Sequence, residues 1–448
     1  MTTLYSARWV LPVSSSPIVD GALAIEEAAI VGVGSYAELA RRYPEAERRS
    51  YGEAAILPGF INAHSHLELT AMRGFLDSVE RDFFSWLRRL TVARLEHMTA
   101  NDLQASATWG ACEALRAGVT CVADASDSAA ESMKALRETG LRGTVYQESF
   151  GPDPKFASEN FAKLTEKVSR LKTLQTSLVQ VGVSPHAPYT VSAPQLEMIS
   201  EFALAGRLPV MMHAAESVAE RMLLAEGSGS FAEGFASRGI EWSAPSVSTI
   251  RYLARHGILQ TQPLLAHCIN VDADDLDLIG ETQTRIAHCP KSNAKLGHGR
   301  APFAEFLRRK LSVGLGSDSV ASNNTCDLLE EARFALLLAR AVDGPNNLSA
   351  SDALHAATLG GARALGLEGV VGELREGCQA DFAVVSLAGT HQLPSYDPVS
   401  CLIFSSSGRD VLLTVVAGKE LYREGSLAGV DEERLRARMN EIKVGLDQ

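Results

Sequence analysis

The chain has 448 residues, of which 46% are hydrophobic and 21% are charged, a composition typical of a globular protein rather than a disordered or membrane-embedded one. Its 54 acidic residues outnumber its 42 basic residues, so the formal net charge is −12 and a polyanionic partner such as nucleic acid is not expected. The length allows a barrel of about 250 residues together with a smaller domain.

The first 57 residues predict small antiparallel strands. Short apolar or alternating stretches, separated by turn residues, run over 7–11, 22–25 and 30–34. We assign residues 1–57 to the first part of a β domain.

Residues 58–368 predict a different architecture, because apolar runs alternate there with helical patterns such as 105–115 and 195–202. Eight strands that alternate with helices form an α/β fold, the (β/α)₈ barrel of TIM type, whose active site lies at the C-terminal ends of the strands. The eight runs with strand character cover 56–63, 119–125, 143–147, 179–184, 210–212, 264–267, 285–289 and 312–316.

The segment 369–448 returns to strand character at 381–385 and 411–416 and ends in a charged amphipathic helix over 432–446. We expect it to pair with residues 1–57 in one small discontinuous β-sandwich domain.

A histidine pair lies at the end of the first barrel run. His64 and His66 are two residues apart, so in a strand their side chains point to the same face and can both reach one ion. Neutral imidazole is the commonest ligand of zinc and also suits iron. A chance pair on a polar loop is the alternative, but the buried strand before the pair and its distant partners favour a metal site.

Those partners are His213, His267 and Asp318, each at the end of another predicted strand. Together with the pair they are more ligands than one catalytic metal needs, because such sites usually keep one position open for water. One histidine is therefore available for catalysis. Glu216 follows His213 by three residues, where a carboxylate can overhang the water and act as a proton shuttle. An exposed glutamate at a helix start is the plainer interpretation of Glu216 alone.

Seven segments resemble the amidohydrolase superfamily, and they are most similar to its branch that contains S-adenosylhomocysteine and methylthioadenosine deaminases, aminodeoxyfutalosine deaminases and chlorotriazine hydrolases. They occur in the family's order from the first barrel strand to the last. The segments are LPGFINAHSH (57–66), MRG (72–74), SPHAPY (184–189), HAAE (213–216), AHC (266–268), HCPKSNAKLG (288–297) and GSDSVASNN (316–324).

The resemblance implies a mononuclear site with His64, His66, His213 and Asp318 as metal ligands. It also implies that His267 polarises the metal-bound water, that Glu216 moves a proton to the leaving nitrogen, and that Asp318 is a proton acceptor as well as a ligand. No lysine ends the fourth strand, where binuclear members often carry a carboxylated one. We therefore expect one divalent ion, with zinc preferred and iron as the alternative.

The resemblance also suggests residues that bind the substrate. His186 is similar to a histidine that contacts the ribose side of nucleosides, and Trp86 matches a pocket tryptophan, although plain helix packing would also explain Trp86. S-adenosylhomocysteine deaminases carry a base-reading glutamate nine residues beyond that tryptophan, where this chain has Leu95. Glu68, in a His-Leu-Glu sequence similar to that of aminodeoxyfutalosine deaminases, is the alternative carboxylate. His298 is a candidate contact for a substrate carboxylate, although a solvated charge on a loop is the plainer interpretation.

Three function classes follow from these observations. The leading hypothesis is a deaminase that releases ammonia from the adenine ring of a 5′-modified nucleoside: aminodeoxyfutalosine, or S-adenosylhomocysteine, methylthioadenosine or adenosine. The second is a chlorotriazine hydrolase or a free-base deaminase of the guanine or cytosine type. The third, a non-enzymatic assembly protein, fits poorly with a complete ligand set.

Cysteine usage and hydropathy indicate a cytoplasmic protein. The seven cysteines include no CxxC pair and are typical of reduced core residues. No stretch approaches the roughly 18 apolar residues of a membrane span, and the N-terminus lacks the pattern of a secretory signal. We expect a small-molecule substrate, no nucleic-acid or membrane partner, and an oligomeric state compatible with a homodimer.

Overall fold

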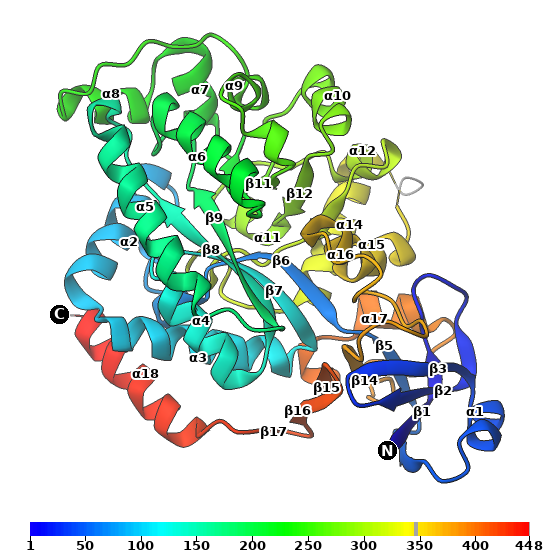
Figure 1. Ribbon diagram of the computed structural model, residues 1–448. Coiled ribbons are helices and arrows are strands. Elements are labelled where there is room, and N and C mark those ends of the chain that lie inside the picture. Colours follow the sequence, from blue (N-terminus) through cyan, green and yellow to red (C-terminus); the bar gives the residue numbers. More distant parts are fainter. Residues whose placement is uncertain (345–347, 448) are drawn as a thin grey trace.

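The structure, a computed structural model, describes residues 1–344 and 348–447. Within them, two parallel four-stranded sheets form one closed barrel (Figure 1). Isolated bridges join the sheets, one between Val183 and Val210 and one between Ser65 and Asp318. The predicted (β/α)₈ barrel is confirmed. Its strands are β6 (Phe60–Ser65), β7 (Val119–Ser126), β8 (Arg142–Ser149), β9 (Val179–Pro185), β10 (Met211–Ala214), β11 (Leu264–His267), β12 (Arg285–His288) and β13 (Val313–Leu315).

The barrel strands were recognisable in the sequence because they are buried along their whole length. All eight residues of β7 are buried, for example. A strand of a parallel sheet packs against the barrel interior on one face and against helices on the other, so it appears as a continuous apolar run.

Helices cover the outside of the barrel, and short 3₁₀ turns extend some of the loops (Figure 1). Among the described residues, no helix combines the length and the apolar character needed to cross a membrane. The helices of the barrel region are α2 (Phe83–His97), α3 (Ala100–Arg116), α4 (Ala129–Thr139), α5 (Ala157–Lys172), α6 (Ala193–Gly206), α7 (Val218–Glu226), α8 (Ser230–Ser237), α9 (Thr249–Arg255), α10 (Ala273–Glu281), α11 (Pro290–Lys295), α12 (Phe303–Arg308), α13 (Val320–Asn323), α14 (Leu328–Asp343), α15 (Ala350–Ala357) and α16 (Leu359–Leu365).

The prediction of one strand over 56–63 is wrong, because two strands share that run. β5 (Ala54–Pro58) belongs to the sheet of the small domain, and β6 begins at Phe60 in the barrel. Gly59 lies between them, and a Cβ there would come within 2.1 Å of the Thr120 side chain. The chain therefore passes from one sheet to the other at the residue that has no side chain, and an apolar pattern alone does not reveal this change.

The small domain is built from both ends of the chain. β14 pairs antiparallel with β5 from Phe382↔Pro58 to Ser386↔Ala54, and this pairing joins the two halves into one continuous sheet. Leu23, Ile56 and Val415 lie in the same buried core. The remaining elements of this domain are β1 (Thr2–Val10), β2 (Ile18–Glu26), β3 (Ala29–Ser35), β4 (Glu47–Ser50), β14 (Phe382–Ser386), β15 (Val411–Val416), β16 (Lys419–Arg423), β17 (Ser426–Leu427), α1 (Tyr36–Arg42) and α17 (Pro398–Ser405).

The last helix, α18 (Glu432–Leu446), has the bounds that the sequence predicts, but it packs on the barrel rather than on the small sheet (Figure 1). Ile442 and Leu446 share a buried cluster with Leu103 of α3. An ion pair between Arg438 and Asp102, with 2.5 Å between Nη2 and Oδ1, fixes the same contact.

We propose the division into 1–57, 58–368 and 369–448, and we expect removal of residues 369–448 to unfold the N-terminal strands. β5 would lose β14, and Ile56 would lose its buried neighbours, while neither end alone has enough strands to enclose a core. The truncated chain should aggregate in size-exclusion chromatography. A control that lacks only 430–448 keeps the sheet and should stay monodisperse. A monodisperse, active chain ending at residue 368 would contradict the division.

Candidate metal centre and active site

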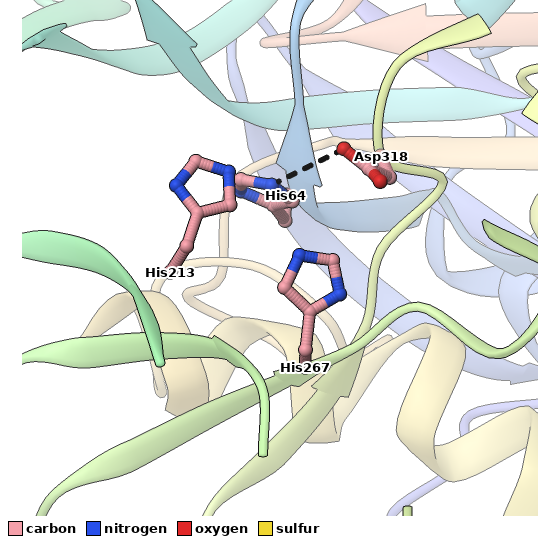
Figure 2. Close-up of side chains that lie close together, drawn as sticks. All are labelled: His64, His213, His267 and Asp318. Carbon is pink, nitrogen blue, oxygen red and sulfur yellow. Dashed lines mark ion pairs between the residues drawn. The ribbon is translucent and has the colours of Figure 1, made fainter. Parts of the chain in front are cut away.

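Donor atoms from four strand ends converge at one place in the barrel mouth (Figure 2). His64 lies in β6, His213 in β10 and His267 ends β11, while Asp318 follows β13. One ligand-type atom of each lies within 4.8 Å of the corresponding atoms of the others, and all four residues are buried. His64 Nε2 is 3.4 Å from Asp318 Oδ1, the contact drawn as a dashed line in Figure 2.

The His66 side chain also points toward this group of donor atoms. Its Nε2 atom is 3.2 Å from His213 Nε2 and 3.5 Å from Asp318 Oδ1. The structure thus brings together the four predicted ligands and places His267 beside them.

Hydrogen bonds between the first and last barrel strands fix these donors. Asn62 Oδ1 accepts from the Ser317 N–H at 2.9 Å, and the Asp318 N–H donates to the His64 carbonyl, also at 2.9 Å. Gly316 lies so close to β6 that a Cβ there would be 2.8 Å from His64 Cβ. The barrel therefore closes at the point where ligands from its two ends must meet.

Three residues at the strand ends have left-handed backbone conformations. The φ angles are 53° at Ala215, 75° at His267 and 58° at Asp318. Non-glycine residues in this region cost on the order of 1–3 kcal/mol each, and such strain is concentrated at functional sites. Here the positive φ values occur at two of the converging residues and directly before Glu216.

The Asp318 carboxylate has a supported side and a free side. Oδ2 accepts hydrogen bonds from the hydroxyls of Ser292 and Ser322, while Oδ1 faces His64 and His66. Burial alone would raise the pKa of Asp318, but the neighbouring His64 side chain outweighs burial and holds the pKa well below its usual value. Asp318 therefore carries a negative charge toward the histidines.

Two of these histidines, His66 and His213, are held in the neutral form that binds metals. Burial, followed by the proximity of His64, lowers the pKa of His66 to about 3. Burial, followed by His186, lowers the pKa of His213 well below its usual value. His213 Nδ1 donates to the His186 carbonyl at 2.8 Å, so its lone pair is on Nε2. Metal ligands must be deprotonated, and these side chains are.

The group fits a divalent metal. In the part of the chain that the structure describes, the Nε2 atoms of His64 and His267 are buried and have no hydrogen-bond partner. Leaving buried polar atoms without partners costs free energy. Nitrogen donors with one carboxylate form the donor set that zinc and related divalent ions prefer, and a bound ion would satisfy the unpaired nitrogens.

Glu216 lies beside His267. Oε1 is 3.6 Å from His267 Nε2, and Oε2 accepts from the Tyr189 hydroxyl at 3.0 Å. His267 Nδ1 donates to Asn293 Oδ1 at 2.8 Å, so His267 Nε2 carries the lone pair and can accept a proton. Burial, followed by the charge of Asp318, raises the pKa of Glu216 to about 8. The carboxyl can therefore hold a proton at neutral pH.

A cavity of about 460 Å³ opens above these groups. Its volume is within the range of small-ligand pockets. The residues that line it include His66, His213, Glu216, Asp318, Glu68, Trp86, Leu87, Leu90, Arg94, Leu95, Asp127, Glu148, Phe150, Pro152, His186, Tyr189 and Arg238.

Two of the predicted substrate residues, Trp86 and His186, line this cavity. The Trp86 indole N–H is buried and has no partner within the described chain, so it is free to donate to a ligand. The His186 ring is held by Thr190, with 2.9 Å between Nδ1 and Oγ1. Leu95 also lines the cavity, but 67% of its side chain is exposed. Position 95 therefore lies near the solvent rather than at the metal centre.

Glu68 lines the cavity, but most of its acceptor capacity is used. Its oxygens accept from the Ser126 hydroxyl and from the N–H groups of Asp127 and Ser128, and Arg94 lies 3.6 Å away. A carboxylate offers about four acceptor positions, so about one remains for a ligand.

His298 does not lie where a substrate contact was expected. The described cavity walls do not include it, and its Nε2 is instead 3.7 Å from Glu216 Oε1. Its ring packs edge-on against Phe83, with centroids 4.5 Å apart. Packing turns the ring toward Glu216, and its Nε2 atom is buried without a hydrogen-bond partner among the described residues, so a contact between His298 and the substrate stays a prediction.

Several residues of the site were missed in the sequence. Tyr189, Ser292, Asn293 and Ser322 lie inside the segments that carry the resemblance, where no pattern assigns them a role. Glu148 lies outside those segments, directly after the run 143–147. A carboxylate at the C-terminal end of a predicted barrel strand was a signal that could have identified it.

Comparison with known proteins gives the family and its relatives. A model described as the amidohydrolase family matches residues 55–421, and one described as an imidazolonepropionase-like composite domain of bacteria matches residues 21–46. A 5-methylthioadenosine/S-adenosylhomocysteine deaminase of Nitratidesulfovibrio vulgaris is 31% identical over 431 residues, which are 95% of this chain and 93% of that protein.

Solved structures agree on the fold. An adenosine deaminase of Xanthomonas campestris with bound zinc has a TM-score of 0.88 and 27% identity, with 99% of this chain and 98% of that chain covered. An atrazine chlorohydrolase of Arthrobacter aurescens complexed with zinc has a TM-score of 0.84 and 24% identity, with 98% and 100% covered. At that lower identity the likeness concerns the fold alone.

Proposed function

The chain belongs to the amidohydrolase family, and on this basis we propose that it is a metal-dependent hydrolytic deaminase that releases ammonia from the adenine ring of a 5′-modified nucleoside. The observation that carries the proposal is the meeting of Glu216 and His267 beside a buried group of metal-type donors at the floor of the cavity. The relative named as a methylthioadenosine/S-adenosylhomocysteine deaminase matches almost the whole chain, which supports the same substrate class.

The donor set supports His64, His66, His213 and Asp318 as ligands of one divalent ion. We propose zinc, because imidazole and carboxylate donors suit it and the structural neighbour of 27% identity holds zinc, and we keep iron as the alternative. When bound, such an ion supplies Lewis-acid activation of water for attack on the ring carbon.

Side chains of the protein then accept and donate the protons of the reaction. His267 Nε2, which bears the lone pair, can accept a hydrogen bond from the attacking water and so orient and polarise it. Protonated Glu216, held by Tyr189, gives its proton to the ring nitrogen. The proton that Asp318 takes from the attacking water then passes to the leaving amino group, which departs as ammonia, and the second proton of that water restores Glu216 when the carbonyl forms. Asp318, charged on its free side, can accept a proton from the water.

Side chains that line the cavity would orient the nucleoside. Trp86 offers an indole ring and an unpaired N–H, and His186 offers a fixed imidazole, so we propose these two as the main contacts to the nucleoside. Glu68 is proposed as a secondary contact through its remaining acceptor position. The apolar side chains of Leu87, Leu90 and others along the walls exclude water from the reacting ring.

The proposal is tested by ammonia release from purified, metal-loaded protein. We expect release from at least one of methylthioadenosine, S-adenosylhomocysteine, adenosine and aminodeoxyfutalosine. Guanine and cytosine should release ammonia, and a chlorotriazine should release chloride, at least 10²-fold more slowly, because a site built to hydrogen-bond one substrate leaves its polar groups unpaired with another, a penalty that reaches about 10⁴- to 10⁵-fold. A metal-loaded protein that is inactive on all four nucleosides would contradict the proposal.

A homodimer and a cytoplasmic location remain predictions. Light scattering of the eluted protein would test the first, and fractionation of the source cells would test the second.

A further inference from the structure

His66 differs from the neighbouring histidines in the hydrogen bonding of its second ring nitrogen, Nδ1. His213 Nδ1 donates to the His186 carbonyl and His267 Nδ1 donates to Asn293 Oδ1, each at 2.8 Å. In the described chain no hydrogen bond is recorded for His66 Nδ1, which faces Glu148 Oε1 at 3.9 Å. Metal-binding histidines almost always donate their other N–H to a carboxylate, a carbonyl or water.

The Glu148 carboxyl also lacks a hydrogen-bond partner for one of its oxygens among the described residues. Glu148 is the penultimate residue of β8, only 6% of its surface is exposed, and Oε1 is buried without a hydrogen-bond partner among the described residues. Arg94, the guanidinium in the same wall, forms its ion pairs with Glu68 at 3.6 Å and Asp127 at 2.6 Å. A buried carboxylate oxygen without a partner is costly, so a donor is expected for it.

We propose that Glu148 is a positioning residue that accepts a hydrogen bond from His66 Nδ1–H and so orients His66 Nε2 toward the metal. The two atoms need to approach by about 1 Å to reach the usual distance of about 2.9 Å. This hydrogen bond fixes the tautomer in which the Nε2 lone pair faces His213 and Asp318.

The inference rests on the metal site of the proposed function and adds a residue to it. Glu148 also lines the cavity, so a direct contact to a substrate hydroxyl is the competing role. The two roles differ in what they change. A residue that acts through His66 changes metal affinity, whereas a substrate contact changes KM and leaves metal affinity intact.

The experiment compares metal affinity in Glu148→Ala, Glu148→Gln and the wild type by competition with a chromogenic chelator for zinc. We expect zinc to bind about 10- to 100-fold more weakly to the alanine variant, the range typical of lost outer-sphere partners. The glutamine variant keeps an acceptor oxygen of the same shape and should lie between. Activity of both should recover as zinc is raised. Asp127→Asn, a matched control, removes a charge from the same wall without contacting a histidine ligand and should bind zinc normally.

A double variant tests whether Glu148 acts through His66. In a double-mutant cycle, Glu148→Ala should cost little further zinc affinity in a protein that already carries His66→Ala, because the effects of contacting residues are not additive. Additive losses, or unchanged zinc affinity with a raised KM in Glu148→Ala, would overturn the inference. Thermal unfolding of the metal-free variants separates misfolding from lost affinity. If the wild type itself binds no zinc or iron, the proposed function fails. If the wild type binds zinc and the Glu148 variants bind it with the same affinity, this inference alone fails.

Discussion

Replacing His64 and His66 by alanine should abolish metal binding and reduce ammonia release to the level of a blank. The two side chains supply donors that lie 3.4 Å and 3.5 Å from the same Asp318 oxygen, so their loss leaves His213 and Asp318 as the remaining proposed ligands. Elemental analysis should find about one metal ion per wild-type chain, as expected for a catalytic site with three or four protein ligands, and almost none in the double variant.

The matched control for this result removes two other imidazoles. His256 and His391 lie at the surface and pair with Glu197 and Asp410. The variant His256→Ala/His391→Ala should therefore retain metal and activity. Two ions per wild-type chain, or full metal content in the His64/His66 variant, would contradict the assignment.

Stripping the metal from the wild type should also lower its stability. A ligand that binds only the folded state contributes about 4 kcal/mol when its free concentration is about 1,000 times Kd. Thermal unfolding of chelator-treated protein should therefore begin at a lower temperature, and added zinc should reverse the change. The double variant should show no such response to zinc.

The barrel and its candidate metal ligands were predictable because both are local signals. Each barrel strand is buried over nearly its full length, so it appears as an apolar run, and His66, His213 and His267 occur at or just past the ends of such runs. The rule that active sites lie at the C-terminal ends of barrel strands then places these residues together without any coordinates.

Other features depended on contacts between distant segments. The change of sheet at Gly59 is set by the Thr120 side chain, which is sixty-one positions away in sequence. The orientation of His267 depends on Asn293, and that of Asp318 on Ser292 and Ser322. Polar residues of these types are common in loops, so no pattern distinguishes the ones that support a ligand. The same holds for Glu148, which the strand-end rule could have indicated but could not have paired with His66.

Converting Glu216 to glutamine should leave metal content and fold intact while reducing kcat by about 10²- to 10⁴-fold, the usual contribution of a general acid or base. The amide keeps the size of the side chain and can still accept from the Tyr189 hydroxyl, but it cannot hold or release the transferred proton. Because burial and the charge of Asp318 raise the pKa of Glu216 to about 8, the native carboxyl is suited to that transfer near neutral pH.

Glu226→Gln, an exposed change at the end of α7, is the matched control and should be fully active. Steady-state rates and metal content should be measured on the same preparations. A slow variant that has also lost its metal would indicate a loss of metal binding rather than a loss of proton transfer. A metal-loaded Glu216→Gln protein that turns over at the wild-type rate would remove this carboxyl from the mechanism and leave His267 and Asp318 as the remaining proton carriers.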